Sequence, residues 1–93
     1  MSYKLFLRPE VIEKDLPKID SANKQRISQA IKQKLTDQPK IFGKPLRWPL
    51  AGLYKLRVGD WRVIFEIKKE TVNIIAVKHR SKAYDNLTIR LPM

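Results

Sequence analysis

Residues 53–67 read Leu53-Tyr54-Lys55-Leu56-Arg57-Val58-Gly59-Asp60-Trp61-Arg62-Val63-Ile64-Phe65-Glu66-Ile67, two alternating runs separated by a Gly-Asp pair. Such a pair between two alternating runs is typical of a two-residue hairpin turn. With the turn at Gly59-Asp60, Val58 lies opposite Trp61 and Arg57 lies opposite Arg62. We therefore predict an antiparallel hairpin over residues 53–67.

The alternation divides this hairpin into an apolar face and a basic face. Lys55, Arg57 and Arg62 share the basic face. Like charges directly opposite each other destabilise a sheet, so an anionic ligand is the natural reason for this pairing. The other face is apolar and carries Tyr54, Leu56, Val58, Trp61, Val63, Phe65 and Ile67.

The composition indicates a small, strongly basic protein. The 93 residues include 20 Lys and Arg against 9 Asp and Glu, a net charge of +11, and no cysteine. The charge favours polyanionic partners such as nucleic acid, the ribosome, an anionic membrane surface or an acidic protein. The lack of cysteine excludes disulfides and thiolate metal sites. We expect a single domain over residues 1–93, without signal peptide or membrane span, and in the cytoplasm.

Upstream of the hairpin, the pattern predicts one strand, two helices and a loop. Residues 3–8 alternate as a short strand, in which we expect Phe6 to be buried, and residues 10–16 form a short helix. Asp20 or Ser21 is a suitable N-cap for a longer helix that ends near Thr36. Its apolar residues recur every four positions, which indicates an amphipathic helix that covers the apolar hairpin face: Ile27, Ile31 and Leu35. Residues 38–50 are rich in proline and are predicted to be a loop.

Downstream of the hairpin, a turn at Lys69-Glu70 leads into a strand over residues 71–79, apolar on both faces and therefore interior. Uninterrupted pairing places Ile64 opposite Ile75 and Arg62 opposite Val77, so His79 falls on the face of Arg62. The predicted fold class is α+β, with two N-terminal helices packed on one face of a small, mainly antiparallel sheet in the order β-α-α-β-β-β.

The predicted topology gathers cationic and proton-transferring side chains on one concave face: Lys55, Arg57, Arg62, His79, Arg80 and Tyr84. The sequence offers no metal-ligand cluster, no Ser-His-acid arrangement and no Gly-rich phosphate loop, so we expect no cofactor. Chemistry at this face would depend on cations alone. Cleavage of RNA by its own 2′-hydroxyl fits, because it requires charge stabilisation and proton transfer but no protein nucleophile.

Each residue type suits one part of that reaction. Arginine forks bind phosphate oxygens. The neighbouring positive charges of Arg57 and Arg62 favour a neutral Lys55 amine that can act as a base. The imidazole of His79 can act as an acid or a base, and Tyr84 can stack on an unpaired base.

Simpler interpretations remain open at this stage. The basic face can bind phosphate without any chemistry, His79 can be an ordinary surface residue, and Tyr84 can anchor the tail on the core. Trp48 and Trp61 are more readily explained as packing residues than as stacking platforms.

The chain resembles the RelE family of bacterial toxins, within the RelE/ParE superfamily. The resemblance is carried by Gly43-Lys44-Pro45-Leu46, by residues 53–65, and by Val77-Lys78-His79-Arg80 followed by Tyr84. It implies a small toxin that cleaves mRNA without metal and thereby inhibits translation, in most characterised members at the ribosomal A site. It also implies a cognate antitoxin that wraps the toxin.

The resemblance implies catalytic roles for individual residues. Lys55 matches a family residue that acts as base or charge stabiliser, and Arg62 matches the phosphate-binding arginine. Arg80 or Lys78 matches the basic residue near the leaving group, and Tyr84 matches the base-stacking tyrosine.

The remaining basic positions are expected to bind substrate. Arg57 stands where the best-known members have a second lysine, and an arginine is a poor base, so Lys55 or His79 inherits that role. Lys78, Lys44 and Arg47 complete the expected binding set, although the last two are also explained as solubilising charges.

Two other classes compete with a nuclease. The ParE branch shares the fold but poisons DNA gyrase, and it generally lacks the full basic and His-Arg-Tyr set that this chain has. The third class is a non-catalytic RNA-binding relative.

Overall fold

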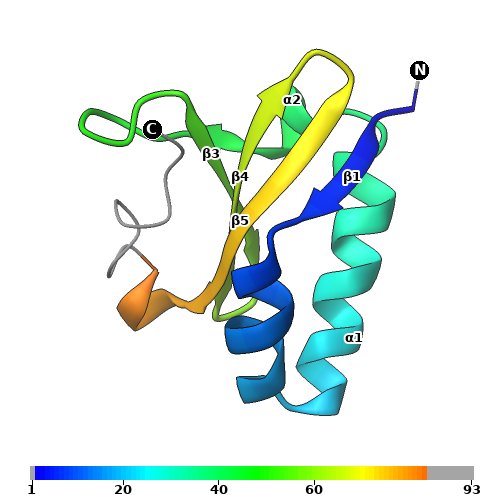
Figure 1. The fold of residues 1–93 in the computed structure, drawn as a ribbon, viewed down its shortest axis with the longest axis vertical. Coiled ribbons are helices and arrows are strands. Elements are labelled where there is room, and N and C mark those ends of the chain that lie inside the picture. Colours follow the sequence, from blue (N-terminus) through cyan, green and yellow to red (C-terminus); the bar gives the residue numbers. More distant parts are fainter. Residues whose placement is uncertain (1, 84–93) are drawn as a thin grey trace.

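The computed structural model describes residues 2–83, which form a five-stranded sheet with helical segments packed against it (Figure 1). The strands are β1 (Lys4–Leu7), β2 (Lys44–Pro45), β3 (Leu53–Val58), β4 (Trp61–Lys68) and β5 (Thr71–His79). The helical segments are η1 (Val11–Asp15), η2 (Leu16–Lys18), α1 (Ser21–Ala30), η3 (Ile31–Leu35), α2 (Pro39–Phe42) and η4 (Arg80–Lys82).

The sheet has the strand order β1-β5-β4-β3-β2. The first strand runs parallel to β5, and every other neighbouring pair is antiparallel. The predicted α+β class, the mainly antiparallel sheet and the interior position of β5 are thereby confirmed. Within residues 2–83, no helix is long and apolar enough to cross a membrane.

The predicted hairpin is confirmed in its register. Val58 pairs with Trp61 and Arg57 pairs with Arg62 across the turn. Gly59 has a φ of 60°, which glycine adopts without the steric cost that other residues pay.

The pairing of β4 with β5 contains a bulge that the sequence pattern did not reveal. Phe65 pairs with Ile74, but Ile64 pairs with Ala76, so Ile75 is an extra residue on β5. The predicted pairing of Ile64 with Ile75 is therefore wrong by one position. An inserted residue of this kind shifts the register of everything beyond it.

The bulge reverses the faces of the last residues of β5. The predicted pair of Arg62 with Val77 is wrong, since Arg62 lies opposite Lys78. His79 lies opposite Trp61, whose neighbours on the same face are core residues. His79 is therefore not on the face of Arg62.

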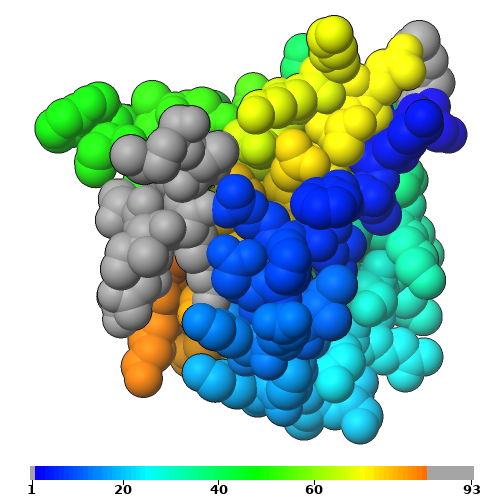
Figure 2. Space-filling view, viewed as in Figure 1, coloured from blue at the N-terminus to red at the C-terminus, as the bar shows by residue number. Residues whose placement is uncertain are grey.

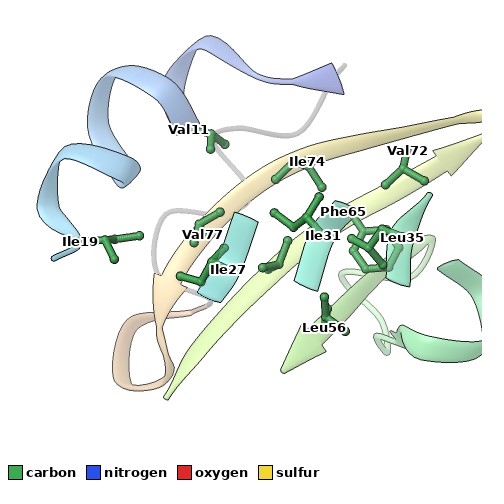
Figure 3. Packing of buried hydrophobic residues seen from close by; sticks show 11 residues of the cluster. Val11, Ile19, Ile27, Ile31, Leu35, Leu56, Phe65, Val72, Ile74 and Val77 are labelled. Carbon is green, nitrogen blue, oxygen red and sulfur yellow. The ribbon is translucent and has the colours of Figure 1, made fainter. Parts of the chain in front are cut away.

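The main core lies between the helical segments and one face of the sheet (Figure 3). Ile27, Ile31 and Leu35 pack there, as predicted from their spacing. Phe65 is fully buried and lies beside Leu35 in Figure 3. The buried members of this cluster are Val11, Ile19, Ile27, Ile31, Leu35, Leu56, Val63, Phe65, Val72, Ile74 and Val77.

A second, smaller cluster occupies the middle of the opposite sheet face. It consists of buried Leu53, Ile64, Ile75 and Ala76, with Leu46 and Leu50 packed against them. The face expected to be basic therefore has an apolar centre, and its cations lie toward one end of the β3–β4 hairpin.

The helical predictions hold in outline. The predicted long helix is α1 followed by a turn with π-type hydrogen bonding, η3. Its N-cap is Asp20, whose side chain accepts a hydrogen bond from the Asn23 backbone N–H. The hydrogen bonds from the side chain and backbone of Asn23 hold the pKa of the exposed Asp20 carboxyl below its ordinary value.

Other local predictions differ from the structure. The predicted loop over residues 38–50 contains α2 and β2; a proline at the first helical position, Pro39, was the available signal. Phe6 is 54% exposed rather than buried.

One buried charge fixes η1 against the open edge of β5. Beyond the Arg8 N–H, which donates to the Ile74 carbonyl, β1 no longer pairs with β5. At the following residues of β5, the Asp15 side chain binds the strand instead. It accepts a hydrogen bond of 2.9 Å from the Val77 N–H and lies 3.2 Å from Lys78 Nζ. Its side chain is 1% exposed, and these contacts help to offset the desolvation of the carboxylate.

Gly43→Ala is expected to destabilise the fold by about 1–3 kcal/mol, because overpacking strains the core. An added Cβ would lie 2.9 Å from the Pro39 carbonyl oxygen and closer still to Phe65 Cζ. The backbone at Gly43 has φ −86°, which alanine adopts freely, so the cost is steric. Urea unfolding measures it. In combination with Phe65→Leu, which vacates the space, the loss should be less than the sum of the two single losses; additivity would contradict the steric cause.

Asp15→Ala is expected to cost about 3–5 kcal/mol, because it leaves a partly buried ammonium and a backbone N–H without their carboxylate. Asp15→Asn keeps an oxygen for the Val77 N–H and should cost less. The denaturant midpoints of the two variants distinguish the contribution of the hydrogen bond to stability from that of the ion pair with Lys78. Equal stability of Asp15→Ala and the wild-type chain would show that this contact does not anchor η1.

Candidate functional site

A groove beside β3 collects positive charge from four elements. It has a volume of about 260 Å³, and five of its seven lining side chains are cationic. None of the described residues that line it carries a carboxylate. We call it the cationic groove; its lining residues are Lys34, Phe42, Lys44, Lys55, Leu56, Arg57 and Arg62.

The sheet register brings these cations together. The short β2 pairs Lys44 with Lys55 and covers only the start of β3. Beyond it no strand of the described residues pairs with this edge of β3, and Arg57 lies directly opposite Arg62 on the next strand. Three like charges in neighbouring positions repel one another, which is the arrangement expected of a site for a polyanion.

Arg62 is held in place by its own hairpin. Its Nη1 donates to the carbonyl oxygens of Gly59 and Trp61, each at 3.0 Å. The side chain is half-buried, and the guanidinium has further N–H donors for a ligand. A fixed fork of this kind suits bidentate binding of phosphate oxygens.

Besides the core residue Leu56, two residues of the groove were missed by the sequence reasoning. Lys34 comes from η3, three residues after the buried Ile31, on the flank of the helix that faces β3. Phe42 ends α2, within a segment predicted to be a loop. The spacing of Lys34 relative to Ile31 was a usable signal, whereas Phe42 needed the unpredicted helix.

His79 lies in a different pocket. This pocket has a volume of about 360 Å³, and we call it the His79 pocket; it is lined by Asp15, Lys18, Trp61, Val77, Lys78, His79 and Lys82. The predicted single concave face that joins His79 to Arg57 and Arg62 is therefore wrong. The bulge at Ile75 is the physical reason, because the extra residue turns the side chains at the end of β5 to the opposite face of the sheet.

The imidazole of His79 is oriented by two neighbours. The Trp61 ring meets it edge-on at 5.5 Å between centroids. Nδ1 lies 3.0 Å from Ser81 Oγ and accepts a hydrogen bond of 3.3 Å from the Ser81 N–H. An amide N–H can only donate, so Nδ1 carries no proton in this arrangement and Nε2 does.

The other predicted site residues that the structure describes lie outside the cationic groove. Lys78, predicted to bind substrate, is paired with Asp15, so its charge is already compensated. Arg80 is exposed and makes a loose 3.9 Å ion pair with Asp60. Arg47 is exposed in the segment between β2 and β3. Tyr84 lies outside the described residues.

The segment between β2 and β3 also carries Trp48, the more exposed of the two tryptophans. The chain between β2 and β3, green in Figures 1 and 2, projects beyond the body of the molecule. Trp48 on this segment is 86% exposed, so the prediction that it packs inside is wrong. Trp61 is half-buried against the main core, as predicted.

The described part of the chain offers little to a metal ion. Residues 2–83 hold no group of three His, Cys, Asp or Glu side chains placed to bind one. The groove instead offers N–H donors and ammonium groups, which bind anions.

Comparison with known proteins places the chain in a family. Residues 7–84 match the family described as ParE toxin of type II toxin-antitoxin system, parDE. Toxin RelG of Mycobacterium tuberculosis is 42% identical over 52 residues, which are 54% of this chain and 60% of that toxin. The matched segment thus spans less than two thirds of this curated relative.

Solved structures of the family have the same fold. The crystal structure of the RelBE2 toxin–antitoxin complex from M. tuberculosis matches with a TM-score of 0.80 and 29% identity, over 86% of this chain and 100% of that one. A mutant of the E. coli toxin RelE in the free state matches with a TM-score of 0.76 and 22% identity, over 99% and 100% of the two chains. The chain therefore belongs to this family of toxins of type II toxin–antitoxin systems, and it is similar to RelE toxins within the RelE/ParE superfamily.

Proposed function

We propose that this toxin is a metal-independent endoribonuclease that cleaves mRNA on the ribosome, at the A site, and so inhibits translation in the cytoplasm. The observation that carries the proposal is the cationic groove, whose lining within residues 2–83 has five cations and no carboxylate. A single-stranded RNA segment is a polyanion that such a groove would attract and hold. Family membership adds to this support.

The proposed reaction is attack by the RNA 2′-hydroxyl on the adjacent phosphorus. The 2′-O–P bond forms, the P–O5′ bond breaks, and the products carry a 2′,3′-cyclic phosphate and a 5′-hydroxyl. In this scheme Arg57 and Arg62 stabilise the charge that builds up on the phosphorane. Lys55, which is half-buried, lines the groove and pairs with Lys44 on β2, removes the 2′-hydroxyl proton.

The position of His79 narrows the assignment of the base. Among the described residues that line the groove there is no imidazole, and lysines are the side chains that can exchange protons with the substrate. Of the two candidates left by the sequence, Lys55 lines the groove and His79 does not. The proposal therefore gives the base role to Lys55, while the ammonium of Lys44 across from it can protonate the 5′-oxygen as it leaves.

An antitoxin is the proposed protein partner. The RelBE2 toxin of M. tuberculosis was crystallised in complex with its antitoxin, and the RelE toxin of Methanococcus jannaschii with RelB. A partner segment that crosses the cationic groove with acidic side chains would match its charge.

Poisoning of DNA gyrase is the second candidate, because the family description that matches residues 7–84 is that of ParE. The two activities leave different traces in cells. Ribosome-dependent cuts within codons, found by mapping RNA 5′ ends after induction, would support the nuclease. DNA damage with intact mRNA would support action on gyrase.

Arg62→Ala is expected to abolish toxicity and to lower RNA cleavage by roughly 10²–10³-fold, because it removes a charge stabiliser from the transition state. Growth after induction and 5′-end mapping measure the two effects. Lys32→Ala is the matched control, since it removes one exposed cation from the helical layer outside the groove and should leave toxicity intact. Survival of toxicity in a folded Arg62→Ala protein would show that the phosphate site is elsewhere.

The variant Lys55→Arg distinguishes the role of Lys55 as a base from its role as a positive charge. Arginine keeps the positive charge but cannot act as a base, so cleavage should fall by roughly 10²–10⁴-fold while RNA binding persists. Single-turnover cleavage and binding of a non-cleavable RNA provide the two measurements. Cleavage at the wild-type rate would exclude Lys55 as the base.

A further inference from the structure

The aromatic ring of Phe42 is exposed and lies in the lining of the cationic groove. Phe42 is 43% exposed although it is a large apolar side chain, and it lines the groove together with the cations. Neither hydrophobic cluster of the described residues includes this ring. Its position beside Lys44 and Lys55 puts an apolar, flat surface within a site otherwise built for phosphate.

The ring is held by a rigid support. Phe42 is the last residue of α2, whose first residue, Pro39, is fully buried. The next residue, Gly43, donates its N–H to the Pro39 carbonyl at 2.9 Å and packs so closely on Phe65 that no Cβ fits. A fixed surface binds a flat ligand with less loss of conformational entropy than a mobile one.

Lys34 completes the arrangement. Its Nζ lies over the Phe42 ring, 5.7 Å from the centroid, within the range of a cation–π interaction. The same ammonium lines the groove, so it can meet a phosphate while it restrains the ring.

We propose that Phe42 and Lys34 form a subsite for an unpaired nucleobase of the RNA bound in the cationic groove. The inference rests on the proposed binding of RNA there and adds a residue that stacks on a base. Every base has a π-face, so stacking on an aromatic ring is tolerant of sequence. An aromatic ring next to a row of cations matches a chain of alternating bases and phosphates better than it matches an inorganic anion.

The test compares ligands with and without bases. Fluorescence anisotropy measures binding of a labelled 2′-O-methyl RNA hexamer, which cannot be cleaved, and of an abasic hexamer with the same phosphates. Phe42→Leu keeps an apolar side chain but removes the ring, whereas Phe42→Trp keeps a ring. Phe42→Leu should weaken binding of the base-containing hexamer by roughly tenfold or more, with the abasic hexamer unaffected and Phe42→Trp close to wild type.

Several outcomes would overturn the subsite. Equal binding of the RNA hexamer by Phe42→Leu and wild type would do so. Equal losses with both hexamers would show that the ring merely supports the phosphate site. An effect confined to binding of a partner protein would assign Phe42, with the neighbouring 72%-exposed Ile41, to a protein interface.

Arg62→Ala distinguishes this inference from the proposed function. It should weaken binding of both hexamers, because it removes a phosphate contact. If Arg62→Ala has that effect and Phe42→Leu has none, the groove binds RNA without the base subsite. If Arg62→Ala changes neither hexamer, the proposed RNA groove itself is wrong.

Discussion

The packing of α1 and η3 on one face of the β3–β4 hairpin is the constraint on which the rest of the structure depends. It buries Leu56, Val63 and Phe65, and strand geometry then sends the intervening side chains to the other side. A slip of one residue would exchange the two sets. Burial of the apolar set therefore holds Lys55, Arg57 and Arg62 together in spite of their repulsion.

Much of this arrangement was predictable because it depends on local pattern. The turn at Gly59-Asp60 set the hairpin register, and the four-residue spacing of Ile27, Ile31 and Leu35 identified the helix that covers it. The same register correctly placed the site residues of the hairpin, Lys55, Arg57 and Arg62, on one face. These features share one property: each is determined by residues that are close together in the sequence.

The parts that were not predicted depend on contacts between distant segments. The bulge at Ile75 leaves no periodic signal, since β5 is apolar on both faces, yet it separates His79 from Arg62. The pairing of Asp15 with Lys78 joins η1 to the end of β5 across 63 positions of the chain. Phe42 reaches the groove only through α2, a single helical turn within a proline-rich stretch. Tertiary contacts of this kind decide which cations are free and which are paired.

The crowding of cations in the groove has a consequence for the lifetime of the protein. Repulsion among five neighbouring cations opposes folding of the unoccupied chain, and any bound polyanion relieves it. By mass action, a ligand that binds only the folded form adds about 2.7 kcal/mol to stability at a hundredfold excess over its Kd. Occupancy by RNA or by an acidic protein would thus protect the chain from proteolysis, and the unoccupied form would be degraded first.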